Sequence, residues 1–206
     1  RDSTPDELID IAMNIEAKVL KVPTGVQDYR PAMYGGLAAI EMTTSGVSRV
    51  PIEIDMRELE RRLLLVYTGQ SRNSGVNNWE ITKKHIDGDP ETTRTFDEIR
   101  DIAEAMRTSL LLGDWPGFGE QLNREWTVRK RLAPNVTTPQ LDDLVSRSFQ
   151  AGAAAAKVCG AGGGGCLIVF GEPGTLANVS SALKQDGAKI LDYRIEPNGL
   201  SVTVEE

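Results

Sequence analysis

The chain has 206 residues, 40% of them hydrophobic, and a formal net charge of −7 at pH 7. This length suits one large or two small globular domains with a substantial buried core. The acidic balance, with no basic run longer than Arg129-Lys130-Arg131, argues against a nucleic-acid partner. No apolar run approaches the length of a membrane span, and the start of the chain lacks the apolar core of a signal peptide. We therefore expect a cytoplasmic protein without a nucleic-acid or membrane partner.

The first predicted element is a helix over residues 4–21. Its first four residues, Thr-Pro-Asp-Glu, supply an N-cap, a proline at the first helical position and a capping box. Apolar residues then recur on one face, at Leu8, Ile11, Ala12, Ile15 and Val19. The segment Pro23-Thr24-Gly25 is expected to end the helix.

The segment Pro23–Pro31 is predicted to be a loop, and Gly35-Gly36 lead from it into a strand. It holds Gln27-Asp28-Tyr29-Arg30 side by side, which is more typical of a site than of a spacer. Asp28 can accept a proton from a substrate hydroxyl, or orient that hydroxyl for attack. The alternative is that Asp28 caps a turn, and composition favours neither role.

Strand-like runs follow at Leu37–Met42, Val50–Ile54 and Leu63–Tyr67, with a turn at Ser45-Gly46. The last run opens abruptly into Thr68-Gly69-Gln70-Ser71-Arg72. A buried strand that ends in hydrogen-bonding residues often ends at a ligand, and an arginine offers planar donors suited to phosphate or carboxylate. For Arg72 taken alone, the simpler interpretation is an exposed arginine in a strand-to-helix turn.

The middle of the chain is predicted to be helical. Thr95 and Glu98 form a second expected capping box, for a helix that runs to Gly113. Asp114 is the expected cap of the next helix, and Thr138-Pro139 opens another. His85 is the only histidine; it lies in a polar stretch and is expected to be a solvated surface residue.

The segment Lys157–Phe170, KVCGAGGGGCLIVF, is the most unusual part of the chain. Five glycines fall within Gly160–Gly165, and a strand-like run follows at once. Because each glycine raises the entropy lost on folding, the run indicates backbone that passes very close to another group, often phosphate oxygens. A flexible linker is the alternative, but linkers usually contain serine and rarely lead into a β-branched strand. Cys159 and Cys166 flank the loop, and we interpret them as two small buried thiols rather than a redox or metal site.

A helix near Thr175–Gln185 and two strands, Lys189–Ile195 and Leu200–Val204, complete the predicted elements. The residues Pro197-Asn198-Gly199 between these strands are a hairpin signal. Strands, then helices, then strands again indicate an α+β fold, and the final strand-helix-strand-strand order fits a split βαβ sandwich.

Three of these segments together resemble the GHMP kinase superfamily, which includes galactokinase, homoserine kinase, mevalonate kinase and phosphomevalonate kinase. KVCGAGGGGCLIVF resembles the family's third motif, a glycine-rich loop that packs against the active site. GVQDYRPAMYGG resembles the segment that supplies the catalytic aspartate in the sugar kinases. LLLVYTGQSRNSG, with GDWPGFGEQLNREWTVRKRL, is most similar to the D-glycero-D-manno-heptose 7-phosphate kinase branch. The similarity extends from Thr4 to the end of the chain.

The resemblance implies a GHMP-kinase-like α+β fold: a remnant of the N-terminal domain over residues 1–65, and a complete C-terminal, ferredoxin-like split βαβ domain over residues 66–206. The family places two further motifs before the first helix, an early strand with a lysine or arginine and a Gly/Ser-rich phosphate loop. Neither is in this sequence, so we expect the C-terminal portion of a kinase. A missing N-terminal segment or a homodimer contact would then cover the exposed strand edges of the remnant.

The implied activity is transfer of the γ-phosphoryl group of ATP, with Mg²⁺, to a hydroxyl of a sugar or sugar phosphate. Asp28 would orient and deprotonate that hydroxyl, Gln27 and Tyr29 would contact the sugar, and Arg72 and Arg30 would hold the substrate's phosphate. Tyr29 stands where related sequences often have glutamine. The remaining site residues that the resemblance implies are Gly25, Thr68, Gly69 and Gln70 for the substrate, and Gly160, Ala161, Gly162, Gly163, Gly164 and Gly165 for the phosphate-proximal loop, with no metal ligand assigned in this chain.

Two alternatives stay open. One is a GHMP kinase for another small alcohol, such as galactose, mevalonate or homoserine, although the Gln27-Asp28 pair favours sugars. The other is a non-catalytic binding module that never had the nucleotide loop.

Overall fold

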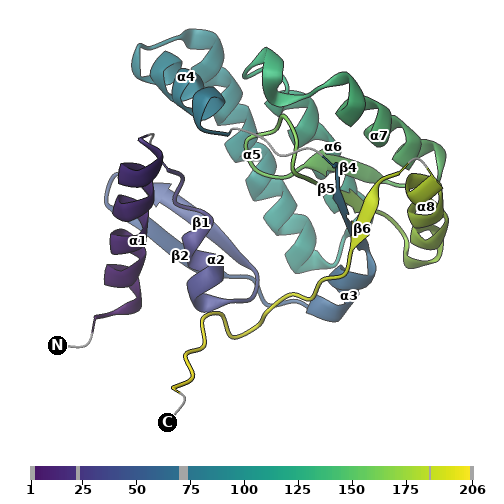
Figure 1. The fold of residues 1–206 in the computed structure, drawn as a ribbon, viewed down its shortest axis with the longest axis horizontal. Coiled ribbons are helices and arrows are strands. Elements are labelled where there is room, and N and C mark those ends of the chain that lie inside the picture. Colours follow the sequence, from purple (N-terminus) through teal and green to yellow (C-terminus); the bar gives the residue numbers. More distant parts are fainter. Residues whose placement is uncertain (1–2, 22–23, 70–73, 186, 205–206) are drawn as a thin grey trace. The chain divides into compact units, whose positions relative to one another are not determined.

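The computed structural model describes residues 3–21, 24–69, 74–185 and 187–204 (Figure 1). The chain divides into two compact units, residues 1–56 with 194–206, and residues 57–193. The division therefore falls earlier than the expected boundary after residue 65, and the C-terminal residues belong with the first unit. The assignment of these units to the two domains of a kinase stays a prediction.

The first unit contains helix α1 (Pro5–Leu20), helix α2 (Tyr29–Tyr34) and a hairpin of strands β1 (Ala38–Thr43) and β2 (Gly46–Pro51). The predicted capping box is confirmed: the Glu7 N–H donates to the Thr4 hydroxyl at 3.3 Å, and the Thr4 N–H donates to the Glu7 carboxylate at 2.8 Å. The expected loop over residues 23–31 is wrong in its last part, because α2 already begins at Tyr29. The apolar stripe of α1 is largely exposed, whereas Ile9 is buried.

The predicted C-terminal hairpin is wrong. In the described residues beyond β6 (Lys189–Leu191), the chain forms no further strand up to residue 204. Backbone groups of this segment bond instead to the region after α2: the Gly36 N–H donates to the Glu196 carbonyl at 2.7 Å, and the Leu200 N–H to the Met33 carbonyl at 3.1 Å. These contacts use groups that a hairpin would have paired with each other, so tertiary packing overrides the Asn-Gly signal.

The second unit is built on a four-stranded sheet of β3 (Leu63–Tyr67), β4 (Ala155–Val158), β5 (Cys166–Phe170) and β6. The strand order is β4-β5-β3-β6, and every neighbouring pair is antiparallel. This order is that of the split βαβ sandwich, and the expected α+β class is confirmed. The helices are α3 (Met56–Arg61), α4 (Ser74–Ile86), α5 (Pro90–Leu112), α6 (Trp115–Arg129), α7 (Pro139–Gln150) and α8 (Pro173–Gln185), with a 3₁₀ turn η1 (Pro134–Val136).

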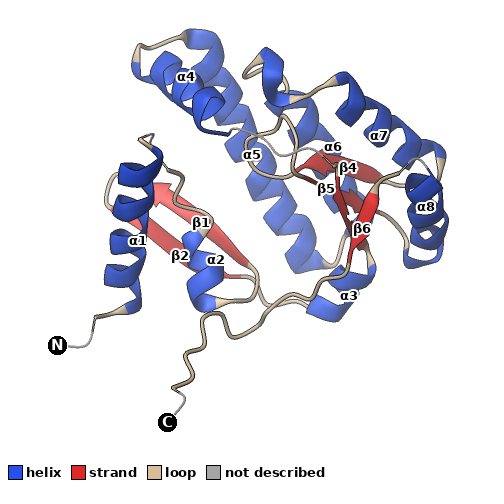
Figure 2. Cartoon of the chain, in the orientation of Figure 1, coloured by secondary structure: helices blue, strands red, loops and turns tan. Residues whose placement is uncertain are grey.

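One face of this sheet forms the core. Val66, Leu167 and Val169 are buried on this face, and their neighbours along β3 and β5 are half-exposed except for Phe170, which is buried at the end of β5. The buried side chains of the sheet pack against side chains of α7 and α8. Figure 2 shows these two helices beside the sheet. The core members that lie in α-helices are Ile81, Trp126, Leu141, Leu144, Val179 and Leu183.

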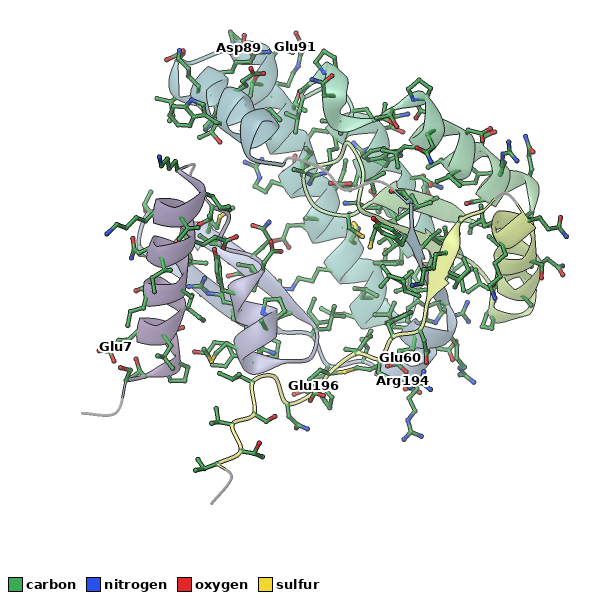
Figure 3. The ribbon with its side chains drawn as sticks, viewed as in Figure 1. Glu7, Glu60, Asp89, Glu91, Arg194 and Glu196 are labelled. Carbon is green, nitrogen blue, oxygen red and sulfur yellow. The ribbon has the colours of Figure 1, made fainter. Side chains whose placement is uncertain are left out.

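Two of three predicted helix starts in the middle of the chain are confirmed. The Asp114 carboxylate accepts from the Gly117 N–H at 3.0 Å, and the Thr138 hydroxyl from the Leu141 N–H at 3.2 Å. The start at Thr95 is wrong, because α5 begins earlier and is capped by Asp89, whose carboxylate accepts from the Thr92 N–H at 2.7 Å (Figure 3). His85 is exposed, as predicted. No helix within the described ranges is long and apolar enough to cross a bilayer.

Asn123 of α6 satisfies the outer edge of β4. Its Nδ2 donates to the Ala154 carbonyl at 2.7 Å, and its Oδ1 accepts from the Ala156 N–H at 3.3 Å. One side chain thus pairs two backbone groups that the sheet would otherwise leave open, and it holds α6 against β4. A backbone group without a hydrogen-bond partner lowers stability most when it is buried, and Ala156 is buried.

We expect Asn123→Ala to lower the free energy of unfolding by about 2 kcal/mol, because both bonds are lost and the Ala156 N–H stays buried. Urea unfolding followed by circular dichroism measures this. Asn178→Ala, at an exposed position of α8, is the matched control and should change stability by less than about 0.5 kcal/mol. Equal effects of the two substitutions would show that the contact with β4 contributes nothing.

Candidate functional site

The glycine-rich loop is the turn that joins β4 to β5. Its glycines, Gly160 and Gly162 to Gly165, all have positive φ, from 65° to 149°. Side chains rarely adopt this backbone region, so glycine is the residue that can follow this path. The flexible-linker alternative is therefore excluded, because the loop is an ordered part of a hairpin.

The loop also approaches another backbone closely. A Cβ on Gly162 would overlap the Val136 carbonyl oxygen, and the Gly163 N–H donates to that oxygen at 2.9 Å. The close approach predicted from the sequence is thus present, and its partner is the protein's own η1 turn. This bond occupies the Gly163 amide. The most accessible residue of the loop is Gly160, which is exposed at the start of the loop.

The end of β3 meets the end of the glycine loop. The Thr68 N–H and hydroxyl both donate to the Gly165 carbonyl, at 3.0 and 2.9 Å, and Thr68 is only 4% exposed. The Gln140 amide at the start of α7 donates to the Thr68 carbonyl at 3.2 Å. The structure therefore brings Thr68, the exposed Gly69 and the loop together, and it adds Gln140, which no local sequence signal marks. The substrate-binding role of Thr68 and Gly69 stays a prediction. Gln70 and Arg72 lie outside the described residues.

A buried ion cluster lies beside the strand that leads into the loop. The Glu125 carboxylate, whose side chain is 6% exposed, contacts Lys157 Nζ at 2.6 Å and Arg129 at 2.5 Å. Burial raises the pKa of Glu125, but the charges of Lys157 and Arg129 outweigh it and hold that pKa below its usual value. For Lys157 burial is the larger effect and lowers its pKa, and the attraction of Glu125 opposes it only in part. The i,i+4 spacing of Glu125 and Arg129 is a local pattern, but Lys157 comes from β4, so no local pattern marks the whole cluster.

The other predicted site residues gather at the start of α2 in the first unit. Gln27 and Asp28 are exposed, and Asp28 precedes α2 without a side-chain bond to its backbone. The Tyr29 hydroxyl donates to the Glu16 carboxylate of α1. Partial burial and the bond to Glu16 raise the pKa of Tyr29. Arg30 is 8% exposed, and its guanidinium donates to the Val26 carbonyl at 3.3 Å.

Gly25, the remaining predicted site residue of this unit, does not approach another backbone closely, unlike Gly162. It is exposed, and a Cβ there would meet only the movable end of the Gln27 side chain. The predicted site residues thus form two groups, one at the start of α2 and one around the glycine loop, each in its own unit.

The residue types in these two groups determine whether each group can bind a metal ion or a phosphate. Among the described side chains, no three of His, Cys, Asp or Glu lie close enough together to bind a metal ion. No Mg²⁺ site is therefore assigned to these residues. The partly exposed backbone of the glycine loop can face phosphate oxygens, whereas the position of a Gly162 side chain is filled by Val136.

Comparison with known proteins shows one consistent relationship. Residues 102–189 match the family described as "GHMP kinases C terminal". The chain is 26% identical over 198 residues to D-glycero-alpha-D-manno-heptose 7-phosphate kinase of Campylobacter jejuni, covering 94% of this chain and 58% of that protein. It is 40% identical over 204 residues to mevalonate kinase of Thermococcus sibiricus, covering 97% of this chain and 58% of that protein.

Solved structures agree at the level of the fold. The crystal structure of L. major mevalonate kinase in complex with R-mevalonate has a TM-score of 0.76 and 21% identity, over 97% of this chain and 60% of that chain. This chain therefore spans between half and two thirds of the length of these relatives.

We expect Gly162→Ala to destabilise the protein by about 2 kcal/mol more than Gly88→Ala, because its Cβ would overlap the Val136 carbonyl. Gly88 is a matched control: its φ of 79° is close to the 83° of Gly162, and a Cβ there would meet nothing within 4 Å, so it reports backbone strain alone. Chemical unfolding of both variants measures the difference. Equal losses would show that the close approach is not a constraint.

We expect Glu125→Gln to lower the free energy of unfolding by about 3 kcal/mol at pH 7, because it leaves a buried Lys157 without its counter-charge. The pKa of Glu125 is lowered in the folded state, so its stabilisation is present above the unfolded pKa and is lost as the pH falls through the folded pKa. The gap between wild type and variant should therefore narrow below about pH 4 in urea unfolding experiments.

The double variant Glu125→Gln/Lys157→Met should recover part of that loss, because it also removes the unpaired ammonium group. A stability gap that stays constant from pH 7 to pH 3 would contradict the ion-pair explanation.

Proposed function

Because residues 102–189 match the family described as "GHMP kinases C terminal", we propose that this chain serves an ATP-dependent small-molecule kinase whose acceptor is a hydroxyl of a sugar or sugar phosphate. The observation that carries the proposal is the match of this domain together with relatives that are kinases and align with more than nine tenths of the chain. The fold similarity to solved kinases supports it.

In the proposed reaction, Asp28 is the residue that orients and deprotonates the accepting hydroxyl. Its exposure and the lack of a side-chain bond to the α2 backbone support this role over that of a helix cap. ATP with Mg²⁺ would supply the transferred phosphoryl group. Such transfer depends mainly on positioning and on neutralisation of charge, so a correctly placed carboxylate and cationic donors are what this chain needs to contribute.

The neighbours of Asp28 would position the acceptor. Gln27 is exposed and can hydrogen-bond to hydroxyl groups. The Tyr29 hydroxyl donates a hydrogen bond to the Glu16 carboxylate, and its oxygen can still accept a hydrogen bond from a substrate hydroxyl. Arg30 uses one nitrogen for Val26 and has further donors for a phosphate, and Arg72 is proposed to share that task.

The second group would face the transferring phosphate. Thr68 holds the end of β3 to the glycine loop, and Gln140 of α7 holds Thr68 in place, so the loop backbone has a defined path. Gly160, Ala161 and Gly165 leave part of that path exposed. We propose that this exposed backbone, rather than the occupied Gly163 amide, approaches the phosphate.

A heptose 7-phosphate-like sugar is the first candidate acceptor, supported by the Gln27-Asp28 pair and by the heptose kinase relative. Mevalonate is the second, favoured by 40% identity to the T. sibiricus mevalonate kinase. ADP release by the complete natural polypeptide, measured with Mg·ATP and a panel of heptose 7-phosphate, galactose, glucuronic acid, mevalonate and homoserine, separates them. If no acceptor raises ADP release above the acceptor-free rate, the proposed function fails.

With the best acceptor, Asp28→Asn should lower kcat by about 100-fold or more and leave ATP affinity unchanged, because the amide cannot accept the proton. Asp10→Asn, at an exposed position of α1, is the matched control and should keep the wild-type kcat. Retention of most activity in Asp28→Asn would remove Asp28 from the mechanism while leaving the kinase assignment intact.

A further inference from the structure

The two cysteines of the chain lie opposite each other at the base of the glycine loop. The β4–β5 ladder pairs Val158 with Leu167, and the next pair in the same register is Cys159 with Cys166. The Cys159 N–H donates to the Cys166 carbonyl at 2.8 Å, which shows that the register continues through this pair. Directly opposite residues of an antiparallel pair project from the same face of the sheet, so the two side chains are neighbours.

Both cysteines are accessible. Each carries a thiol rather than a disulfide, and each is partly exposed, so the interpretation of two buried thiols is wrong. The reason is the strand alternation: Val158 and Leu167 occupy the buried face, and Cys159 and Cys166 therefore fall on the half-exposed one. An oxidant can reach this face.

The spacing of such a pair suits a disulfide. Hydrogen-bonded opposite residues have Cα atoms about 5.5 Å apart, inside the range of about 4.4–6.8 Å found in disulfides. Their Cβ atoms are typically about 1 Å farther apart than a relaxed disulfide requires, so the strand ends must move together slightly. Gly160 and Gly165 adjoin the pair at the end of the ladder, where backbone adjustment is easiest.

A positive charge lies near the same pair. Lys157 is two residues from Cys159 on the same strand face, and attraction to a Cys159 thiolate is one of the effects that raise the pKa of Lys157 against its burial. The same attraction favours the thiolate, which is the reactive form of cysteine.

We propose that Cys159 and Cys166 form a reversible disulfide across the base of the glycine loop. With hydrogen peroxide as the oxidant, the Cys159 thiolate attacks one peroxide oxygen, the O–O bond breaks, and a sulfenic acid and hydroxide form. The Cys166 thiolate then attacks the sulfenic sulfur, the S–S bond forms, and hydroxide leaves and takes up a proton as water. In sum, two thiols and one peroxide give one disulfide and two waters. Because the bond would be strained and partly exposed, glutathione should reduce it.

The disulfide would tie the two ends of residues 160–165 together covalently. The loop then loses the freedom to open at its base, which changes the backbone on which the phosphate-proximal site is proposed to lie. The formation of the bond itself does not depend on the proposed kinase activity.

Peptide mass mapping tests the proposal directly. No lysine or arginine lies between Lys157 and Lys184, so one tryptic peptide, residues 158–184, contains both cysteines. After treatment with hydrogen peroxide and then iodoacetamide, this peptide should carry no alkyl group and be lighter than its reduced form by two hydrogen atoms. Treatment with glutathione before alkylation should restore a doubly alkylated peptide.

The matched control is the double variant Cys166→Ser/Ile168→Cys, which keeps two thiols on the same strand face but places them diagonally. Diagonal positions are about 7–8 Å apart, so internal closure should be at least about tenfold slower than in the wild type. The proposal is overturned if the wild-type peptide keeps two alkylatable thiols, gains only oxygen atoms, or closes no faster than this control.

Discussion

The antiparallel pairing of β3 with β5 determines where the second unit places its candidate site. The ladder joins segments that are far apart in the sequence and aligns Tyr67 with Cys166, so that the next residues, Thr68 and Gly165, meet just beyond it. A slip of one residue would turn every side chain of β3 to the opposite face. Val66 would then leave the core, and Thr68 would no longer bond to the loop. Core packing and site geometry therefore depend on the same register.

For the glycine loop, the sequence pattern predicts the loop itself but not the group that the loop contacts. Five glycines in six residues correctly indicated an ordered loop with a close backbone approach. The group that is approached, the Val136 carbonyl, was not predictable, because η1 meets the loop only through packing between distant segments. The Glu125–Lys157 ion pair and the Gln140 bond were not predictable for the same reason, because each joins residues of different elements. The position of Asp28 before α2 was also missed, since a six-residue helix after a glycine-framed loop has weak local signals.

Local signals predicted local structure well where nothing competed with them. The caps at Thr4, Asp114 and Thr138 depend on contacts within three residues, and each was confirmed. The cap at Thr95 was displaced because Asp89-Pro90 offers an equivalent start earlier in the chain. The C-terminal hairpin failed for a different reason: its backbone groups find partners beside α2. Turn chemistry at Asn198-Gly199 is compatible with both arrangements, so only tertiary contacts distinguish them.

The side chain of Asn123 has a further consequence for how molecules of this protein meet one another. Strands at the border of a sheet expose a row of donors and acceptors that can recruit a strand from a neighbouring molecule, and this is a common route to aggregation. Along β4 the amide of Asn123 already occupies the Ala154 carbonyl and the Ala156 N–H. At the opposite border β6 is only 3 residues long. The sheet of the second unit is thereby protected against growth at both of its borders.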